Sequence, residues 1–227
     1  MKVDYLIIGG GIYGCMTAWR LAQAGAETML LEASRIASGT SGGAGKRGVR
    51  ANGRDLRELP LMKLSYETWP TLHEELSADT GFEETGHLRL IEKSVDMLAA
   101  EPLTWMQTKQ GIETQVLKHE ELKEREPLLS NRFIGATFCP KDGIADHSLT
   151  TRAVARAAVS SGAEIREHCA LQDVKIQSSE VFSAITADEE EIKIGKAIVF
   201  LSNTHTIDFL ANRFHLELPI WAWLPQV

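Results

Sequence analysis

Cysteines are scarce in this 227-residue chain, which has three of them and no two close together. Cys15, Cys139 and Cys169 show no Cys/His spacing that would place four ligands around a zinc ion, so we predict no metal site. The low cysteine count favours a reducing, cytoplasmic setting.

Long apolar runs are missing as well, since no stretch reaches the ~18 uncharged apolar residues that a membrane-spanning helix needs. The apolar segment that ends at Ile8 follows Asp4 and leads directly into glycines. A signal peptide has a basic region and then an apolar one, which this start does not resemble. We therefore expect no membrane anchor.

Positive charge is not in excess either, because the formal net charge is −7 and the pI is near 5.5. The cations are dispersed apart from one short basic stretch, formed by Lys46, Arg47, Arg50, Arg54 and Arg57. Nucleic-acid-binding domains concentrate Lys and Arg on one face, so we expect no nucleic acid partner.

What the chain does contain, at its start, is the pattern of a strand-helix-strand unit. Residues 3–8 form a short apolar run that ends in three glycines, which is typical of a buried strand. Small and apolar residues then recur at helical spacing over 12–24, Gly25 supplies a stop, and 27–31 resumes a buried strand. The sequence thus predicts a complete βαβ unit of about 30 residues.

The connection between the first strand and the helix fits G-x-G-x-x-G, and its position gives the motif physical meaning. Gly9 allows a tight turn, Gly11 lets the backbone approach a pyrophosphate, and Gly14 allows the helix to pack closely on the sheet. The helix start at Ile12 supplies N–H donors and partial positive charge. A diphosphate is the ligand that this arrangement favours.

Glu32 lies 18 residues after Gly14, at the end of the second strand, where a carboxylate can accept hydrogen bonds from ribose hydroxyls. The alternative interpretation is that the glycines merely end a strand and Glu32 is solvated. We favour the nucleotide site because strand, helix and acid are in register. The unit by itself does not distinguish FAD from NAD, since both contain an ADP half.

After this unit, the first half of the chain reads as mixed α+β. We predict a long functional loop over 34–53, because six glycines occur among small and basic residues. Helices are predicted over 55–78, 95–109, 119–125 and 148–160, strands over 87–91 and 134–139, and a loop over 142–147.

The later part of the chain reads mainly as strands. Three short segments, 171–177, 181–187 and 190–194, have breaks of turn length between them and predict an antiparallel meander. A further buried strand is expected over 197–201, a short helix over 206–213 and a strand over 218–227, in which Trp221 and Trp223 share a face.

Residues 4–14, with Ala18, Leu21, Ala22, Gly25 and Glu32, resemble the opening of the D-amino acid oxidase superfamily, which includes glycine and sarcosine oxidases. The resemblance continues through 37–41, 48–50, 85–90, 120–128, 135–136, 142–146 and 171–174 in the family order. It covers essentially the whole chain, and its motifs are specific in the first 50 residues.

This resemblance implies FAD as the cofactor. It implies an α/β fold in which a Rossmann-like FAD-binding domain, residues 1–79 and 143–204, is interleaved with an incomplete α+β substrate domain, residues 80–142 and 205–227. The implied cofactor-binding residues are Gly9, Gly11, Ile12, Gly14, Glu32, Ala33, Ser38, Thr40, Ser41 and Val174. In the family, the residue matching Val174 contacts the adenine through its backbone.

Three features depart from the family pattern. Ser202-Asn203-Thr204-His205 stands where a small-small-Gly turn packs on the cofactor, so the backbone could be held farther from FAD. Lys46-Arg47 replaces small residues in the flavin-side loop; these cations either stabilise charge on the reduced flavin or, as we favour, are solvated. In the family, much of the substrate site follows the point matching Val227.

By resemblance, the complete enzyme oxidises a small amine or amino acid by hydride transfer to flavin N5. We assign no catalytic residue, and Cys15, in the first helical turn, is expected to be a packing residue rather than a thiolate. The alternatives are a non-catalytic half or regulatory subunit that needs a partner chain, and an NAD-dependent dehydrogenase. We expect a complementary polypeptide, or self-association through the C-terminal strand, to complete the fold.

Overall fold

The computed structural model describes residues 1–39, 45–178 and 180–219. The chain divides into two compact units. Unit 1 comprises Met1–Ala44 and His147–Val227, and unit 2 comprises Gly45–Asp146. Both units contain helices and strands, so the predicted α/β class is confirmed.

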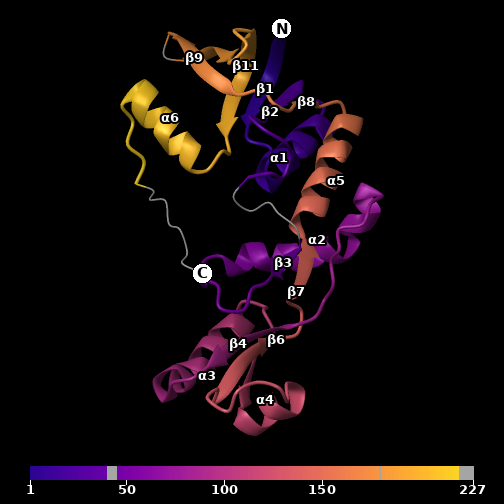
Figure 1. The fold of residues 1–227 in the computed structure, drawn as a ribbon, viewed down its shortest axis with the longest axis vertical. Coiled ribbons are helices and arrows are strands. Elements are labelled where there is room, and N and C mark those ends of the chain that lie inside the picture. The colour runs from indigo at the N-terminus through magenta and orange to yellow at the C-terminus, as the bar shows by residue number, and fades with distance from the viewer. Residues whose placement is uncertain (40–44, 179, 220–227) are drawn as a thin grey trace. The chain divides into compact units, whose positions relative to one another are not determined.

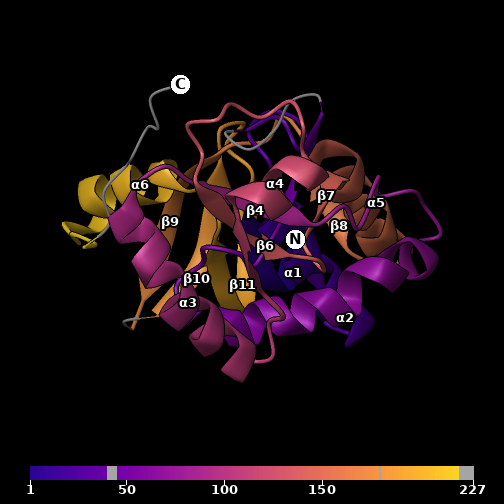
Figure 2. The same cartoon turned by 90° about the horizontal axis from the view of Figure 1, so that it is seen from below.

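Unit 1 is built on a six-stranded sheet with the order β8-β2-β1-β11-β10-β9. Its strands are β1 (Lys2–Ile8), β2 (Thr28–Leu31), β8 (Glu164–Arg166), β9 (Leu171–Gln177), β10 (Glu180–Thr186) and β11 (Glu191–Phe200). β1 pairs in parallel with β2 and β11, and β2 pairs in parallel with β8. The strands β9, β10 and β11 form the predicted antiparallel meander (Figure 2).

Two helices, α1 (Ile12–Gln23) and α5 (His147–Ser160), pack against each other in unit 1 (Figure 1). Leu30 of β2 faces α1, because a Cβ atom at Gly14 would lie 3.5 Å from its Cδ1. Successive residues of a strand point to opposite faces, so Met29 and Leu31 point away from α1. Every residue of β2 is buried, as a strand covered on both faces requires.

The opposite face of the sheet holds a hydrophobic cluster that joins the parallel strands to the meander. Leu6, Leu31, Val174 and Ile192 are among its buried members. The helix α6 (Thr204–Phe214) contributes Phe209 and Phe214 to it, and their rings pack against each other. The antiparallel strands are therefore anchored to the βαβ unit by side-chain packing as well as by hydrogen bonds.

Unit 2 contains a three-stranded antiparallel sheet with the order β4-β6-β5 and a separate two-stranded ladder of β3 and β7. Its strands are β3 (Lys46–Val49), β4 (His87–Ile91), β5 (Gln115–Lys118), β6 (Gly135–Cys139) and β7 (Gly143–Asp146). Its helices are α2 (Leu59–Leu76), α3 (Ser94–Lys109) and α4 (His119–Arg125).

Two segments that we predicted to be loops, 34–53 and 142–147, contain strands that pair with each other. Lys46 of β3 is opposite Asp146 of β7, and Val49 is opposite Gly143. The prediction was wrong because the partner of each strand lies far away in the sequence and leaves no local periodicity. The strands predicted separately over 190–194 and 197–201 are likewise one continuous strand, β11.

The two units divide the chain after Ala44 and after Asp146, whereas the domains expected from the resemblance change at 79, 142 and 204. Compactness does not identify the residues that contact a cofactor, so that functional division stays a prediction. The strand predicted over 218–227 lies mostly outside the described residues. Within the described residues, no helix is long and apolar enough to cross a membrane.

Candidate functional site

The glycine-rich turn between β1 and α1 has a geometry that depends on its glycines. Gly9 has a φ of +113°, and a Cβ atom there would lie 2.7 Å from the carbonyl oxygen of Leu201. A Cβ atom at Gly14 would lie 1.9 Å from the carbonyl oxygen of Gly9. Both positions therefore require glycine for the turn to close and for α1 to approach the sheet.

Gly11 differs from Gly9 and Gly14, because the packing of the turn leaves room for a side chain at this position. A Cβ atom at this position would meet nothing within 4 Å, and the residue is exposed. The space in front of the Gly11 backbone is open, as it must be if a diphosphate is to approach the main chain.

The amino end of α1 presents backbone donors beside this open space. Gly11 is the N-cap residue, its backbone is extended, and no side chain caps the helix there. The first N–H groups of a helix have no partner within the helix and carry partial positive charge. Ile12 begins α1, and no acidic residue occupies the first turn. The helix end is thus suited to bind an anion.

Glu32 lies immediately after β2, and its carboxylate is fixed by two backbone N–H groups. Oε2 accepts a hydrogen bond of 2.6 Å from Gly10, and Oε1 accepts one of 2.8 Å from Ser34. Each carboxylate oxygen has two lone pairs, so both retain one for a further donor such as a ribose hydroxyl. Sequence reasoning did not identify Gly10 as a site residue, although it stands in the glycine run.

The segment that follows Glu32 is attached to the same turn. The amide of Ala37 donates to the carbonyl of Gly10 at 3.1 Å, and the amide of Ile36 donates to Glu167 Oε1 at 2.6 Å. Ser38 closes a local turn by donating its hydroxyl to the carbonyl of Arg35 at 2.7 Å. Ala33 and Ser38 are exposed.

The contribution of Glu167 to this segment had no signal in the sequence, because 131 positions separate it from Ile36. Of the remaining cofactor-binding residues that we predicted, Thr40 and Ser41 lie outside the described residues.

Val174 belongs to β9, is buried, and shares the hydrophobic cluster with Leu31. Its amide donates to Asp173 Oδ1 at 2.8 Å, and its carbonyl accepts a hydrogen bond of 3.3 Å from Arg213. The segment that leads into β9 runs beside the end of β2, since Cys169 donates its amide to the carbonyl of Glu32 at 2.9 Å. Val174 therefore packs in the same cluster as the residue before Glu32, and the segment that precedes β9 is hydrogen-bonded to Glu32 itself.

The turn after β11 contains Asn203, which belongs to the segment Ser202-Asn203-Thr204-His205 that stands where the family pattern has a small-small-Gly turn. Asn203 has a φ of 51° and a ψ of −124°, a backbone conformation that favours glycine. Leu201 remains bonded to the first strand, because its amide donates to the carbonyl of Ile8 at 2.8 Å. The glycine-type turn is therefore formed with an asparagine in it.

Cys15 and Lys46 are the reactive and the charged group near the expected cofactor loop. Burial, with the carboxylates of Glu32 and Glu167, raises the pKa of Cys15 to about 12, so the thiol stays protonated and acts in packing. Lys46 forms an ion pair of 2.5 Å with Glu83 inside unit 2. The role of this charge toward a flavin stays a prediction. Among the described residues, no group of three metal-ligating side chains occurs.

These observations together test whether the residues fit a dinucleotide cofactor. The open backbone at Gly11, the uncapped end of α1 and the fixed carboxylate of Glu32 supply the donors and acceptors that an ADP group requires. They fit FAD and NAD equally well, since the two cofactors share that group.

The sequence matches the family described as "FAD dependent oxidoreductase" over residues 4–222. It is 31% identical over 225 residues to 4-methylaminobutanoate oxidase (formaldehyde-forming) of Paenarthrobacter nicotinovorans, covering 97% of this chain and 26% of that protein. It is 28% identical to sarcosine oxidase subunit beta of an Arthrobacter species, covering 96% and 55%. It is 25% identical to the pyruvate dehydrogenase phosphatase regulatory subunit, mitochondrial, of Mus musculus, covering 85% and 22%.

The fold is similar to the crystal structure of L-proline dehydrogenase from P. horikoshii, with a TM-score of 0.84 and 31% sequence identity. The similarity covers 92% of this chain and 55% of that one. The chain therefore spans about half or less of the length of the relatives that it matches.

Proposed function

The chain belongs to the family of FAD dependent oxidoreductases, and from this premise we propose that unit 1 binds the ADP half of FAD between its glycine-rich turn and Glu32. The observation that carries the proposal is the fixed carboxylate of Glu32, held by the amides of Gly10 and Ser34. Its free lone pairs would accept hydrogen bonds from the hydroxyls of a ribose.

The chain's own residues would bind and orient the cofactor. The uncapped amino end of α1, from Ile12, would hold the pyrophosphate through backbone N–H groups. Ala33, Ser38, Thr40, Ser41 and Val174 are proposed as further contacts. Bound FAD supplies the two-electron acceptor for a hydride, and the chemistry of that step belongs to the cofactor. The negative charge of Glu32 would disfavour a cofactor that carries a 2′-phosphate on this ribose.

We propose a small amine or amino acid as the substrate of the complete protein. The names of matched relatives support this class, because they include an oxidase of a methylamino acid and a subunit of a sarcosine oxidase. A substrate carboxylate in such enzymes is commonly held by Arg or Tyr groups, and we assign none in this chain. The domain division of residues 1–79 and 143–204 for FAD, and of 80–142 and 205–227 for substrate, is kept as part of the proposal.

We further propose that the chain works with additional polypeptide. The relative named as a subunit beta supports a partner chain, and the C-terminal strand predicted from the sequence is a candidate surface for it. A non-catalytic, regulatory role is the second candidate, supported by the similarity to a subunit named as regulatory. The cytoplasmic setting predicted from the three cysteines stays a prediction.

Titration of the purified chain with FAD, NAD⁺ and ADP-ribose tests the cofactor proposal. FAD should bind with a perturbed flavin absorption spectrum, and Glu32→Ala should weaken its binding about tenfold or more, because a charge-assisted hydrogen bond is lost. Glu27→Ala, which removes an exposed carboxylate at the other end of β2, is the matched control. Equal FAD affinity in all three proteins would contradict the proposal.

A second experiment, on the FAD-loaded chain, distinguishes the catalytic role from the regulatory role. Mixing it anaerobically with glycine, sarcosine, proline or D-amino acids should reduce the flavin if the chain is catalytic. Binding of FAD without reduction by any of them, alone or with added partner chain, would favour the regulatory role. Light scattering on the same sample measures self-association.

A further inference from the structure

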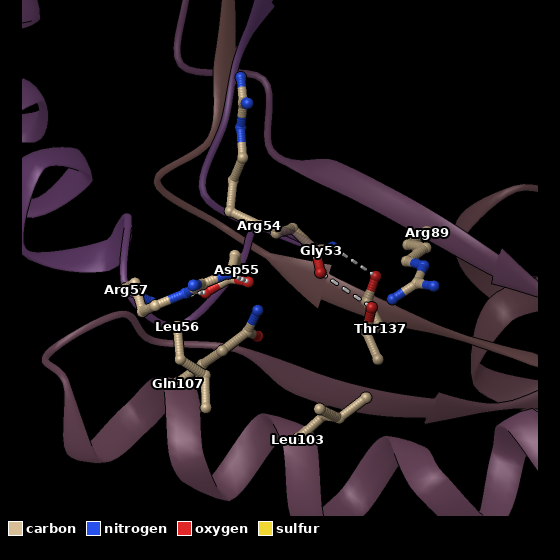
Figure 3. Close-up of a pocket in the computed structure, with 10 residues that line it drawn as sticks. Gly53, Arg54, Asp55, Leu56, Arg57, Arg89, Leu103, Gln107 and Thr137 are labelled. Carbon is tan, nitrogen blue, oxygen red and sulfur yellow. Dashed lines mark hydrogen bonds and ion pairs between the residues drawn. The ribbon is translucent and has the colours of Figure 1, made fainter. Parts of the chain in front are cut away.

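Unit 2 contains a cavity of about 440 Å³ that has no role in the proposed nucleotide site (Figure 3). It lies between the loop that precedes α2, the strands β4 and β6, and the helix α3. Its polar lining includes Asn52, Arg89, Gln107 and Thr137, and Leu56 and Leu103 are its apolar part. None of the residues proposed to hold FAD belongs to this cavity.

Gln107 of α3 is a largely buried residue whose side-chain amide has no hydrogen-bond partner among the residues that the structure describes. Only 5% of the residue is exposed, and its amide points from α3 into the cavity (Figure 3). Its backbone carbonyl accepts hydrogen bonds from Gln110 and Ile112, but its side-chain amide bonds to no described residue. The amide is not among the fully buried side-chain groups without a partner, so its atoms face the open space of the cavity, where they are available to a ligand.

Arg89 of β4 provides a cation on the opposite wall of the cavity. Its side chain passes Gly53, since a Cβ atom there would lie 3.2 Å from Arg89 Cδ, and its guanidinium lies near Thr137 (Figure 3). Within the described part of the chain, this guanidinium has neither a hydrogen bond nor an ion pair. Its five donors are therefore available to an anion.

The other two cations of the cavity are already neutralised. Arg57 donates from Nε at 2.9 Å and Nη2 at 2.8 Å to the two oxygens of Asp55, and Arg54 pairs with Glu58 at 3.4 Å. The guanidinium of Arg57 holds the pKa of Asp55 well below its usual range, so that carboxyl stays ionised. Arg89 is thus the cation left to balance a ligand, and one cation matches a monoanion better than a phosphate dianion.

The wall between Arg89 and Gln107 is held rigidly by buried polar groups. Asn52 donates its side-chain amide to the carbonyls of His87 and Thr137 at 3.0 and 2.9 Å, and the Thr137 hydroxyl donates back to Asn52 Oδ1 at 2.9 Å. The backbone N–H of Asn52 also donates to the buried carboxylate of Asp142 at 3.0 Å. These bonds keep the cavity open without a ligand, which lowers the cost of binding.

We propose that this cavity binds a small monocarboxylate with a short hydrocarbon group. Arg89 would hold the carboxylate in the two-pronged geometry that guanidinium groups favour, and Gln107 would donate to one of its oxygens or to a neighbouring polar group. The hydrocarbon part would lie against Leu56 and Leu103, the apolar lining of the cavity. The site is additional to the proposed FAD site and does not depend on it.

Isovalerate is a suitable probe, with isovaleramide as its uncharged analogue and inorganic phosphate as a dianion. Each compound is titrated into the purified full chain, and binding is monitored by calorimetry and by the NMR signals of the Gln107 side-chain amide. Isovalerate should bind, whereas isovaleramide and phosphate should not. Arg89→Gln should weaken this binding about tenfold or more, and Gln107→Leu should weaken it several-fold. Arg132→Gln, which removes an exposed guanidinium of unit 2 outside the cavity lining, should leave it unchanged.

Three results would overturn the proposal: equal binding of the acid and the amide, equal loss in the Arg89→Gln and Arg132→Gln proteins, or no shift of the Gln107 amide on titration. If Arg89→Gln does not fold, Arg89→Lys replaces it, because lysine keeps the charge and loses the planar fork. That protein should bind isovalerate several-fold more weakly, and unchanged affinity would count against the assignment of Arg89.

Discussion

The amide of Gly10 donates a hydrogen bond of 2.6 Å to Oε2 of Glu32, and the amide of Ser34 donates to the other carboxylate oxygen at 2.8 Å. The carboxylate thereby joins the glycine-rich turn to the residues that follow β2. Glu32 has a structural role in unit 1 as well as the proposed one toward FAD.

Replacing Glu32 with Gln should therefore destabilise the chain even without a cofactor. The amide group of Gln has one acceptor and one donor end, so one of the two backbone N–H groups would face another donor. The free energy of unfolding should fall by about 1–3 kcal/mol in a urea titration. Glu27→Gln serves as the control, and equal stability of the two variants would refute this role of the carboxylate.

Substitutions at Gly11 and Gly14 should separate binding from stability. Gly14→Ala places a methyl group 1.9 Å from the carbonyl oxygen of Gly9 and should cost about 3 kcal/mol or more. Gly11→Ala meets nothing within 4 Å, so it should cost about 1 kcal/mol or less while reducing FAD affinity about tenfold. Thermal unfolding and FAD titration of both variants provide the measurement. A Gly11→Ala protein that binds FAD normally would exclude a close approach of the pyrophosphate at this residue.

Asn203→Gly should stabilise the chain. The φ of 51° and ψ of −124° at Asn203 are strained for a residue with a side chain, and glycine removes that strain. The free energy of unfolding should rise by about 1 kcal/mol, the order of strain at such positions. Asn212→Gly, inside α6, should act in the opposite direction because glycine weakens helices. A loss of stability in both variants would show that Asn203 is not strained in solution.

Tyr66→Phe should destabilise unit 2. The Tyr66 hydroxyl donates a hydrogen bond of 2.5 Å to Oδ1 of Asp142, a fully buried carboxylate that also accepts the amides of Ala51 and Asn52. Removing one donor from a buried charge should cost about 1–3 kcal/mol in urea unfolding. Tyr13→Phe is the control, since Tyr13 is 77% exposed. Equal stability of the two variants would mean that the hydroxyl contributes nothing to holding Asp142.

His87 should make the stability of the chain depend on pH. Burial lowers the pKa of His87 below its ordinary value of 6.5; Asp142 opposes this change and Arg50 adds to it. As the pH falls below 6.5, the unfolded chain takes up the proton before the folded one, so the free energy of unfolding decreases. Above pH 6.5 His87 is neutral in both the folded and the unfolded chain, so it causes no loss in the free energy of unfolding there.

The comparison of His87→Gln with the wild type between pH 7 and pH 5 tests this dependence. The variant should lose less stability on acidification, whereas His73→Gln, which removes an exposed histidine of α2, should follow the wild type. A wild-type curve parallel to that of His87→Gln would contradict the prediction.

The sequence by itself determined the βαβ unit, the antiparallel meander and the family. The signals for these are local: apolar runs that end in glycine, helical spacing over about one dozen residues, and turn residues between short strands. α4 and β4 were predicted to the residue, and α1 and α3 to within one residue at each end. Glu32 could be named as a candidate from the sequence because the G-x-G-x-x-G pattern predicts a second strand with an acidic residue at its end; its contact with a cofactor stays a prediction.

Only the tertiary structure decided the features that depend on residues far apart in the chain. The pairing of β3 with β7, the support of Ile36 by Glu167 across 131 positions, and the convergence of Arg89 and Gln107 on one cavity have no local pattern. Hydrophobic periodicity reports which face of an element is buried, but not which distant element covers it. Those partners are selected by side-chain packing and by the hydrogen bonds that buried polar groups must make. Both kinds of contact form only when distant segments come together as the chain folds.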